Sequence, residues 1–309
     1  MDSSLNLRRG IKRVLTEASG GLTAGYILKA VAEAGAQGIA SDIEDLSYAD
    51  AFGAEFLKVP ASDDELLWEK MASLVSQNKI DLVIPSLDET LLGWSKRQEE
   101  FSKLGCRVII SPIDTIEICQ DKWKTYQFFL ENSIPTPSTS LSQLYPLVKP
   151  RDGRGGRGIL RTSKEVDMTN MISQEVISGQ EYTVDVLFDH QSRPVYIIPR
   201  RRIGVVDGKS TKGVVEKNDQ ISDYIVKMSK ILKFYGPINF QCFIQDEAIK
   251  FLEINPRVAG GMALGFAASE NWITLIINNI LNNIEIRPKE INYGLTMLRY
   301  YGEHFVPRV

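Results

Sequence analysis

Phe251-Leu252-Glu253-Ile254-Asn255-Pro256-Arg257 is the stretch of this sequence that decides the fold. From Leu252 to the proline, apolar and polar residues alternate, and a strand is predicted over 248–254. Side chains at positions i and i+2 of a strand lie on the same face, so Glu253 and Asn255 point the same way. A carboxylate and an amide oxygen are therefore expected side by side.

A second strand is predicted over 237–244, and it carries Gln241. Carboxylate and carbonyl oxygens are ligands that Mg²⁺ accepts, with phosphates and water completing its shell. The sequence therefore predicts a magnesium site at Gln241, Glu253 and Asn255. The alternative is a strand with an exposed polar face.

Residues 151–158 contain four glycines and three arginines. Glycines let backbone N–H groups turn toward an anion, and the arginines add positive charge, so the segment suits a polyphosphate. It is not a Walker loop, because Ile159 and Leu160 follow where that motif needs lysine and serine or threonine. A surface hairpin is the alternative. The candidate phosphate-binding residues are Lys149, at the end of an apolar strand over 145–149, and Gly153, Arg154, Gly155 and Gly156.

Two strands, 173–177 and 181–188, are predicted on either side of Gly179. Such a pair presents backbone groups to the edge of an adenine at Gln174, Glu175 and Val176, and a carboxylate to a ribose at Glu181. An ordinary hairpin is the alternative interpretation.

The first 115 residues alternate short apolar segments with helical patterns, which predicts a parallel sheet covered on both faces. Asp88 and Glu89 follow a strand predicted over 80–85, and they either meet a substrate amino group or cap the next helix. A dinucleotide-binding turn is the competing interpretation of the first strand and helix. Against it, Leu22 occupies the position of the motif's middle glycine.

Composition narrows the class of protein. The chain has 309 residues, of which 43% are hydrophobic and 24% charged, as in ordinary globular proteins. A net charge of −3 offers no basic field to nucleic acid, and no apolar run approaches the roughly 20 residues that span a membrane or forms a signal-peptide core. The three cysteines are widely spaced, which predicts reduced thiols and a cytoplasmic protein. Only two histidines are present, which argues against imidazole catalysis.

Taken together and in this order, these segments resemble the ATP-grasp superfamily. Within it they are most similar to the carboxylate–amine ligase branch that resembles the large subunit of carbamoyl phosphate synthase. Asp121-Lys122 resembles the family's opening signature, which implies that Lys122 lies near the nucleotide phosphates. Val148-Lys149-Pro150 resembles the strand whose lysine contacts phosphate and adenine, and residues 151–158 match the loop that folds over the phosphates.

The segment of residues 251–257 is the most specific match to the family. The resemblance implies that Glu253 and Asn255 bind magnesium and that Arg257 stabilises the transferring phosphoryl group and the acyl phosphate. Gln241 stands where the family often has an acidic ligand, which leaves the number of bound metal ions open. Lys149 and Arg257 are the implied catalytic residues.

The resemblance implies an α/β fold in three parts. A Rossmann-like preATP-grasp domain is expected over 1–115, followed by a two-subdomain ATP-grasp fold. An α+β lid subdomain with the glycine loop is expected over 116–185, and the catalytic subdomain over 186–309.

The implied activity is an ATP- and magnesium-dependent ligase, with manganese as the alternative metal. It joins a small carboxylic acid to an amine through an acyl phosphate and releases ADP and phosphate. Two alternatives stay open: phosphoryl transfer that ends at an acyl or carbamoyl phosphate, and a non-catalytic nucleotide-binding protein. A homodimer is also left open. The candidate substrate contacts are Asp88, Glu89, Arg200, Gly260 and Gly261; Arg200 lies in a run of three arginines that otherwise ends a strand in solvent.

Overall fold

The computed structural model describes residues 12–21, 23–45, 47–153, 155–206, 209–300 and 302–305. The chain divides into two compact units. One unit comprises Met1–Ile110, Glu270–Arg287 and Leu298–Val309, and the other comprises Ser111–Ser269 and Pro288–Met297. The three-part division at 115/116 and 185/186 stays a prediction.

The first unit is built on a five-stranded parallel sheet in the order β3-β2-β1-β4-β5. The strand order reverses at β1, which is where open sheets of this kind have a crevice at the carboxyl ends of their strands. The strands are β1 (Arg13–Thr16), β2 (Gln37–Asp42), β3 (Glu55–Lys58), β4 (Leu82–Ile84) and β5 (Arg107–Val108).

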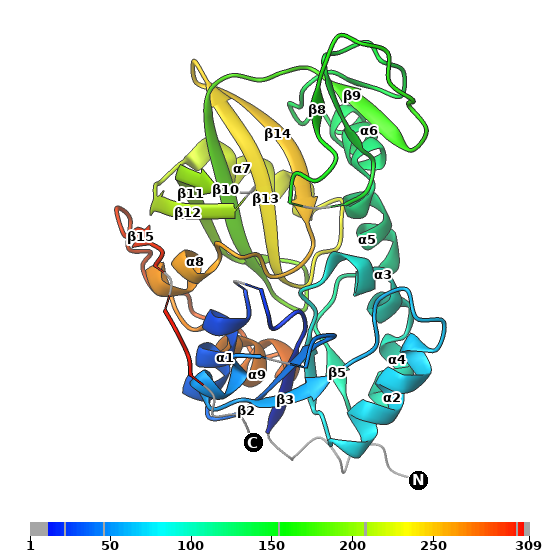
Figure 1. Ribbon diagram of the computed structural model, residues 1–309. Helices are drawn as coiled ribbons and strands as arrows, with labels where there is room; N and C mark the ends of the chain where they lie inside the picture. Colours follow the sequence, from blue (N-terminus) through cyan, green and yellow to red (C-terminus); the bar gives the residue numbers. More distant parts are fainter. Residues whose placement is uncertain are drawn as a thin grey trace. The chain divides into compact units, whose positions relative to one another are not determined.

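Helices surround this sheet, and one of them comes from near the end of the chain. α9 packs on α1 (Figure 1), where Asn271 Nδ2 donates a hydrogen bond of 2.8 Å to Ala30 O. The helices are α1 (Ala24–Glu33), the 3₁₀ helix η2 (Ala49–Phe52), α2 (Leu67–Gln77), α3 (Asp88–Lys96), α4 (Gln98–Lys103), α9 (Trp272–Asn278) and the 3₁₀ helix η3 (Ile280–Asn282).

A buried carboxylate fixes the segment between β4 and α3. Glu17 is 6% exposed and accepts hydrogen bonds from Ser86 N (3.1 Å), Thr90 Oγ1 (2.9 Å) and Trp94 Nε1 (2.8 Å). Burial raises the pKa of Glu17 even though these donors favour its charged form. The first turn of α3 is therefore held to the end of β1.

The second unit contains a six-stranded sheet in the order β14-β13-β10-β11-β12-β15. The neighbours from β14 to β12 pair antiparallel. The strands are β10 (Gln180–Phe188), β11 (Pro194–Val206), β12 (Lys209–Val215), β13 (Gly236–Gln245), β14 (Ala248–Asn255) and β15 (Thr296–Leu298).

The two faces of this sheet differ in chemistry. Apolar side chains of one face pack with those of α5 (Ile113–Gln120), α6 (Lys122–Glu131) and α7 (Asp219–Ser229) in one buried core. Because side chains alternate along a strand, the other face of β10 carries Glu181, Thr183 and Asp185. Thr183 lies opposite Gln241, and Gln241 lies opposite Glu253, so these polar residues share that face.

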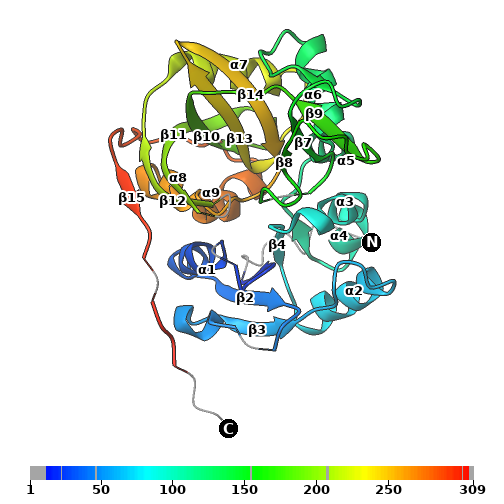
Figure 2. The ribbon, with the colours of Figure 1, turned by 45° about the horizontal axis from the view of Figure 1, so that its top comes forward.

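A smaller four-stranded sheet, in the order β6-β9-β7-β8, accompanies α6 (Figure 2). The glycine loop joins two of its antiparallel strands, β7 and β8, as predicted. The strands are β6 (Thr139–Ser140), β7 (Leu147–Pro150), β8 (Leu160–Arg161) and β9 (Met171–Gln174).

The α/β fold class and the parallel N-terminal sheet are confirmed. The sequence also predicts a short helical stretch near residues 164–170, and this prediction is wrong. Side chains bind the backbone there instead: Thr162 Oγ1 accepts from Lys164 N at 3.0 Å, and Asp167 Oδ1 accepts from Thr169 N at 2.9 Å. Such local hydrogen bonds compete with a helix. The helix α5 and the strand β12 were not predicted. No helix in the described ranges is long and apolar enough to cross a membrane.

Replacement of Glu17 tests how the end of β1 holds α3. In Glu17→Ala, the Ser86 amide and the Trp94 indole lose their acceptor while buried, so we expect the free energy of unfolding to fall by roughly 2–5 kcal/mol. Urea denaturation measures the change. Glu99→Ala, at an exposed position of α4, should stay within about 0.5 kcal/mol of the parent; equal effects of the two substitutions would contradict this role of Glu17.

Candidate functional site

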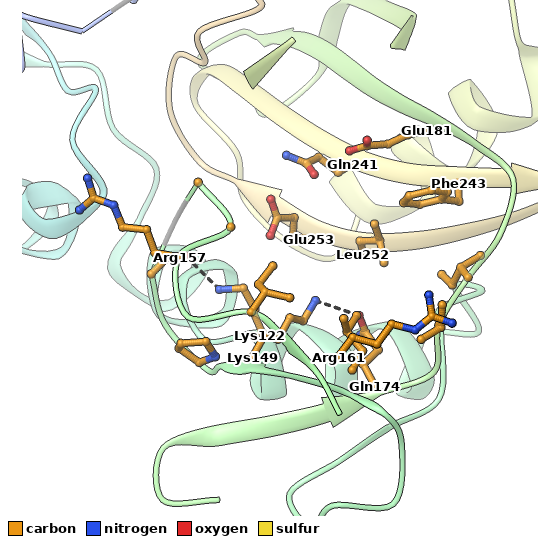
Figure 3. Close-up of a pocket in the computed structure, with 18 of the residues that line it drawn as sticks. Lys122, Lys149, Arg157, Arg161, Gln174, Glu181, Gln241, Phe243, Leu252 and Glu253 are labelled. Atoms are coloured by element: carbon orange, nitrogen blue, oxygen red, sulfur yellow. Dashed lines mark hydrogen bonds between the residues drawn. The ribbon is translucent and has the colours of Figure 1, made fainter. Parts of the chain in front are cut away.

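A cavity of about 420 Å³ lies within the second unit. It is lined by residues from five stretches that are far apart in the sequence (Figure 3). Those that the sequence predicts as binding residues are Lys122, Lys149, Gly153, Gly155, Gly156, Gln174, Glu175, Val176, Glu181, Gln241 and Glu253.

Lys149 is the buried cation of the cavity. Lys149 lies near the end of the apolar strand β7 and is 7% exposed. Its Nζ donates a hydrogen bond to Gln174 Oε1 at 2.8 Å. Burial lowers the pKa of Lys149 to about 8; Glu253 opposes this shift and the charge of Lys122 adds to it. The amine therefore gains most from an anion that enters the cavity.

The glycine loop is tied at its start to the beginning of α6. Asp121 caps this helix, accepting from Trp123 N at 2.8 Å, and also pairs with Arg151 (Nη2 to Oδ2, 2.5 Å). Lys122 Nζ donates to Gly153 O at 2.9 Å. Beyond this anchor the glycines adopt positive φ angles, from +65° at Gly155 to +97° at Gly153, a conformation that side chains rarely allow.

The segment after β9 borders the cavity as a braced hinge. Glu175 accepts from Lys250 Nζ (2.7 Å) and from Ser138 N (3.1 Å), and these contacts lower its pKa. The Glu175 amide itself donates to Ser138 O at 2.9 Å. The Glu175 amide is therefore not available to a nucleotide. Only the neighbouring backbone groups of this segment could form hydrogen bonds with an adenine base.

Glu181 lines the cavity but forms an ion pair with Arg202 on the adjacent strand β11. Burial raises the pKa of Glu181, and the Arg202 charge opposes the shift. Phe243 and Leu252 supply an apolar wall close by (Figure 3). This end of the cavity therefore has an apolar surface for a base beside a carboxylate that can accept hydrogen bonds from a ribose.

Two of the predicted metal ligands, Glu253 and Gln241, lie across the cavity from the two lysines (Figure 3). Asn255 Nδ2 donates to Glu253 Oε1 at 3.1 Å, and Asn255 Oδ1 lies 3.4 Å from Arg257 Nη2. The amide would have to rotate to place its oxygen beside the carboxylate. Within the described part of the chain, no three His, Cys, Asp or Glu residues cluster as a metal site. These oxygens fit magnesium, which needs few protein ligands when phosphates supply others.

Two further predicted residues, Asn255 and Arg257, do not line the cavity itself. Arg257 Nη1 donates to Val258 O at 3.1 Å, so its guanidinium lies along the chain that leaves β14. Arg154 lies outside the described residues. Asp88 and Glu89 begin α3 in the first unit, after the N-cap Leu87. They lie in the first turn, where negative charge is favourable, rather than at the cap.

Arg200 is not a solvated strand end, because it is 1% exposed. Its guanidinium pairs with Asp185 through Nε to Oδ2 (2.5 Å) and Nη2 to Oδ1 (2.8 Å). Gly261 packs directly on this guanidinium, and Gly260 precedes it in the same turn. Three of the tentative substrate residues thus lie together over β10 and β11.

The ion pair of Arg202 with Glu181 was not predicted from the sequence, and neither were roles for Asp185 and Thr183. A signal for the last two was present: in the apolar strand of residues 181–188, polar residues occupy 181, 183 and 185, all on one face. The pairing of Arg202 with Glu181 joins different strands and has no local signature.

Two family models match the chain. One, described as "ATP-grasp in the biosynthetic pathway with Ter operon", matches residues 167–300. The other, "PylC-like, N-terminal domain", matches residues 18–109.

Curated relatives match over part of their length. The arginine-specific large chain of carbamoyl phosphate synthase from Bacillus subtilis is 22% identical over 227 residues, which are 62% of this chain and 22% of the relative. The corresponding large chain from Lachnoclostridium phytofermentans is 24% identical over 234 residues, 63% of this chain and 22% of the relative. The chain thus matches about a fifth of the length of these relatives.

Solved structures share the fold. The biotin carboxylase domain of the Hydrogenobacter thermophilus 2-oxoglutarate carboxylase, in complex with MgADP, ADP and bicarbonate, has a TM-score of 0.73 at 18% identity and covers 93% of this chain and 74% of its own. The N5-carboxyaminoimidazole ribonucleotide synthetase of Thermus thermophilus has a TM-score of 0.71 at 16% identity and covers 94% of this chain and 84% of its own.

Lys149→Met tests the buried cation. Loss of a charge-assisted hydrogen bond to phosphate should weaken MgADP binding by about 10–100-fold at pH 7. In the parent, affinity should fall as the pH rises through about 8, because the free amine loses its proton there and binding must restore it. Isothermal titration calorimetry between pH 6.5 and 9.5 measures both effects.

The variant should lack this pH dependence. Lys103→Met, at an exposed position at the end of α4, should keep the parent's affinity and its pH profile. A Lys149 variant with unchanged affinity would exclude contact between this amine and the phosphates.

Proposed function

We propose that this chain, which joins an ATP-grasp domain to a PylC-like N-terminal domain and is homologous to the large chain of carbamoyl phosphate synthase, is an ATP- and magnesium-dependent carboxylate–amine ligase. It forms an amide through an acyl phosphate and releases ADP and phosphate. The whole activity of the longer relatives is not implied, since the match covers 22% of their length.

One observation carries the proposal. A single cavity brings the buried amine of Lys149 and the amine of Lys122 opposite the carboxylate of Glu253, below a glycine loop and beside an apolar wall (Figure 3). A magnesium–nucleotide complex has matching parts: anionic phosphates, a cation that needs carboxylate and amide oxygens, and an apolar base. Lys149 and Lys122 bind the phosphates, and the hinge at Gln174, Glu175 and Val176 meets the adenine.

The reaction needs no protein nucleophile. A carboxylate oxygen of the acid attacks the γ-phosphorus of ATP, the bond to the β,γ-bridging oxygen breaks, and ADP leaves. The amine nitrogen then attacks the acyl carbon, phosphate leaves, and the nitrogen loses a proton. Lys149 and Arg257 neutralise the charge that develops on the transferring group, and the glycine loop excludes water from the acyl phosphate.

Glu253, Asn255 and Gln241 would hold the metal. When bound, Mg²⁺ or Mn²⁺ polarises the phosphoryl oxygens and offsets their charge. Glu253 and Asn255 lie within hydrogen-bond distance of each other, at 3.1 Å, so one ion can contact both after the amide rotates. The neutral Gln241, directly across from Glu253 in the sheet, supports one tightly held ion rather than two.

The substrates are a small carboxylic acid and an amine. Arg200, Gly260 and Gly261 lie on the polar face of the sheet that carries Glu253, which supports a place for the acid there. Asp88 and Glu89 are proposed to meet the amine. Bicarbonate, present in the similar Hydrogenobacter structure, is the simplest acid to test. The cytoplasmic location of the chain and its assembly into a homodimer also stay predictions.

A second function is favoured by one finding. Both curated relatives are large chains of carbamoyl phosphate synthase. A phosphorylated acid or a carbamoyl phosphate as the final product would use the same cavity, since the phosphoryl transfer comes first in either case. The dependence of ADP release on the amine distinguishes an amide product from a phosphorylated one.

A screen of ADP release over acids and amines tests the function. The ligase predicts release that requires Mg²⁺, an acid and an amine together; release with the acid alone supports the acyl phosphate or carbamoyl phosphate product. A chain that binds MgATP and turns over with none of the acids would be a nucleotide-binding protein.

Asn255→Ala tests the metal site in that assay. Loss of a metal ligand removes several kcal/mol of transition-state stabilisation, so turnover should fall about 100-fold or more. Asn132→Ala, at the C-cap of α6, is the matched control and should keep the parent's rate. Equal rates in the two variants would sink the proposed metal site.

A further inference from the structure

Arg200 and Asp185 form a buried ion pair on the polar face of the large sheet. The Arg200 and Asp185 side chains are 2% and 0% exposed, and their 2.5 Å and 2.8 Å contacts form a fork. Asp185 Oδ1 also accepts from Asn239 Nδ2 at 2.8 Å. The carboxylate thus holds the guanidinium in one orientation and directs its remaining nitrogen, Nη1, away from the pair.

This remaining nitrogen is buried without a partner. Within the described ranges, Arg200 Nη1 makes no hydrogen bond, and neither does Thr183 Oγ1. Thr183 is 6% exposed and lies directly opposite Arg200 on the neighbouring strand. Buried polar atoms are nearly always satisfied in folded proteins, so two exceptions on facing residues indicate a group that is absent from the polypeptide.

The two residues lie in one row of the sheet with two of the proposed metal ligands. Thr183 is opposite Gln241, and Gln241 is opposite Glu253, so one row across the sheet runs from Arg200 to the metal ligand. Neighbouring strands are about 4.8 Å apart, which places Thr183 roughly 5 Å from Gln241 and 10 Å from Glu253 along this row. A group that reacts with a metal-bound phosphate belongs at this separation.

Two glycines pack closely against the pair. A Cβ atom at Gly261 would lie 2.7 Å from Arg200 Nη1, and one at Gly265 in α8 (Ala263–Ala268) would lie 2.8 Å from Asp185 Oδ2. Any side chain at Gly261 would therefore press on the guanidinium and displace Nη1. The turn before α8 thus holds this nitrogen in place from the side opposite Asp185.

We propose that Arg200 Nη1 and Thr183 Oγ1 bind the reacting carboxylate of the acid substrate and hold it toward the γ-phosphate. The inference rests on the proposed ligase function, because it assigns the acid to this part of the same site. A carboxylate oxygen accepts from both a guanidinium N–H and a hydroxyl, and its charge suits the arginine. Asp185 is a positioning residue, since it acts only through Arg200.

Thr183→Val is the most direct test, because it removes the hydroxyl and keeps the shape. Removal of Arg200 would leave Asp185 buried and unpaired, which destabilises the fold. With the full chain saturated with MgADP, line broadening of [1-¹³C]acetate and of ¹³C-bicarbonate reports carboxylate binding without turnover. We expect about tenfold weaker binding in Thr183→Val, as for one lost hydrogen bond to a charged group.

The control is Thr16→Val, which makes the same change at another buried threonine whose hydroxyl has no partner in the described structure. It should bind both anions as the parent does, and all variants should keep the parent's affinity for MgADP. Unchanged anion binding in Thr183→Val would overturn the inference and indicate that a buried water satisfies these atoms.

Gly261→Ala tests the same donor independently. The added methyl group lies against Arg200 Nη1 and should weaken anion binding at least as much, whereas Gly302→Ala, with nothing within 4 Å of the added Cβ, should not. Binding that survives Gly261→Ala would also overturn the inference. Failure of the ligase proposal would look different. In that case no acid would drive ADP release in the parent, while acetate binding would still be weakened by Thr183→Val.

Discussion

The alternation of side chains along β10 and β13 is the constraint on which the rest of the site depends. One face of these strands must bury its apolar residues against α5, α6 and α7. Every second residue then faces the opposite side, where Glu181, Thr183 and Asp185 stand in line on β10. The burial of one face therefore fixes the polar face of β10, whereas in β14 a register shift at Leu252 places both Leu252 and Glu253 in the cavity lining.

Burial also sets the electrostatics of the site. Lys149 is held at the end of an apolar strand with a lowered pKa, and the charge of Glu253 only partly offsets the cost of its desolvation. Arg200 lies deeper, and Asp185 compensates its charge directly. The desolvation cost of the Lys149 charge is only partly compensated within the protein, so a bound polyphosphate stabilises it further. The Arg200 charge is already neutralised by Asp185, and its Nη1 is the donor left for a ligand.

Much of this arrangement follows from local sequence. The spacing of Glu253 and Asn255 on one strand, the glycines after Lys149 and the strand–helix alternation of the first 115 residues each reflect a short-range rule, and the structure has the corresponding elements. The partners of the arginines were not predicted, because Asp185, Glu181 and Glu216 pair with them across strands that only the fold brings together. The helix expected over 164–170 was wrong because its polar side chains bind the backbone instead.

The transfer of oxygen from acid to phosphate tests the central claim most directly. The acid that supports ADP release is supplied with both carboxylate oxygens as ¹⁸O, and the inorganic phosphate is analysed by mass spectrometry or ³¹P NMR. Attack of the carboxylate on the γ-phosphorus of ATP predicts one ¹⁸O atom in each phosphate released with the amide. Phosphate that carries oxygen from water, with both labelled atoms left on the acid or its product, would contradict an acyl phosphate and with it the proposed ligase.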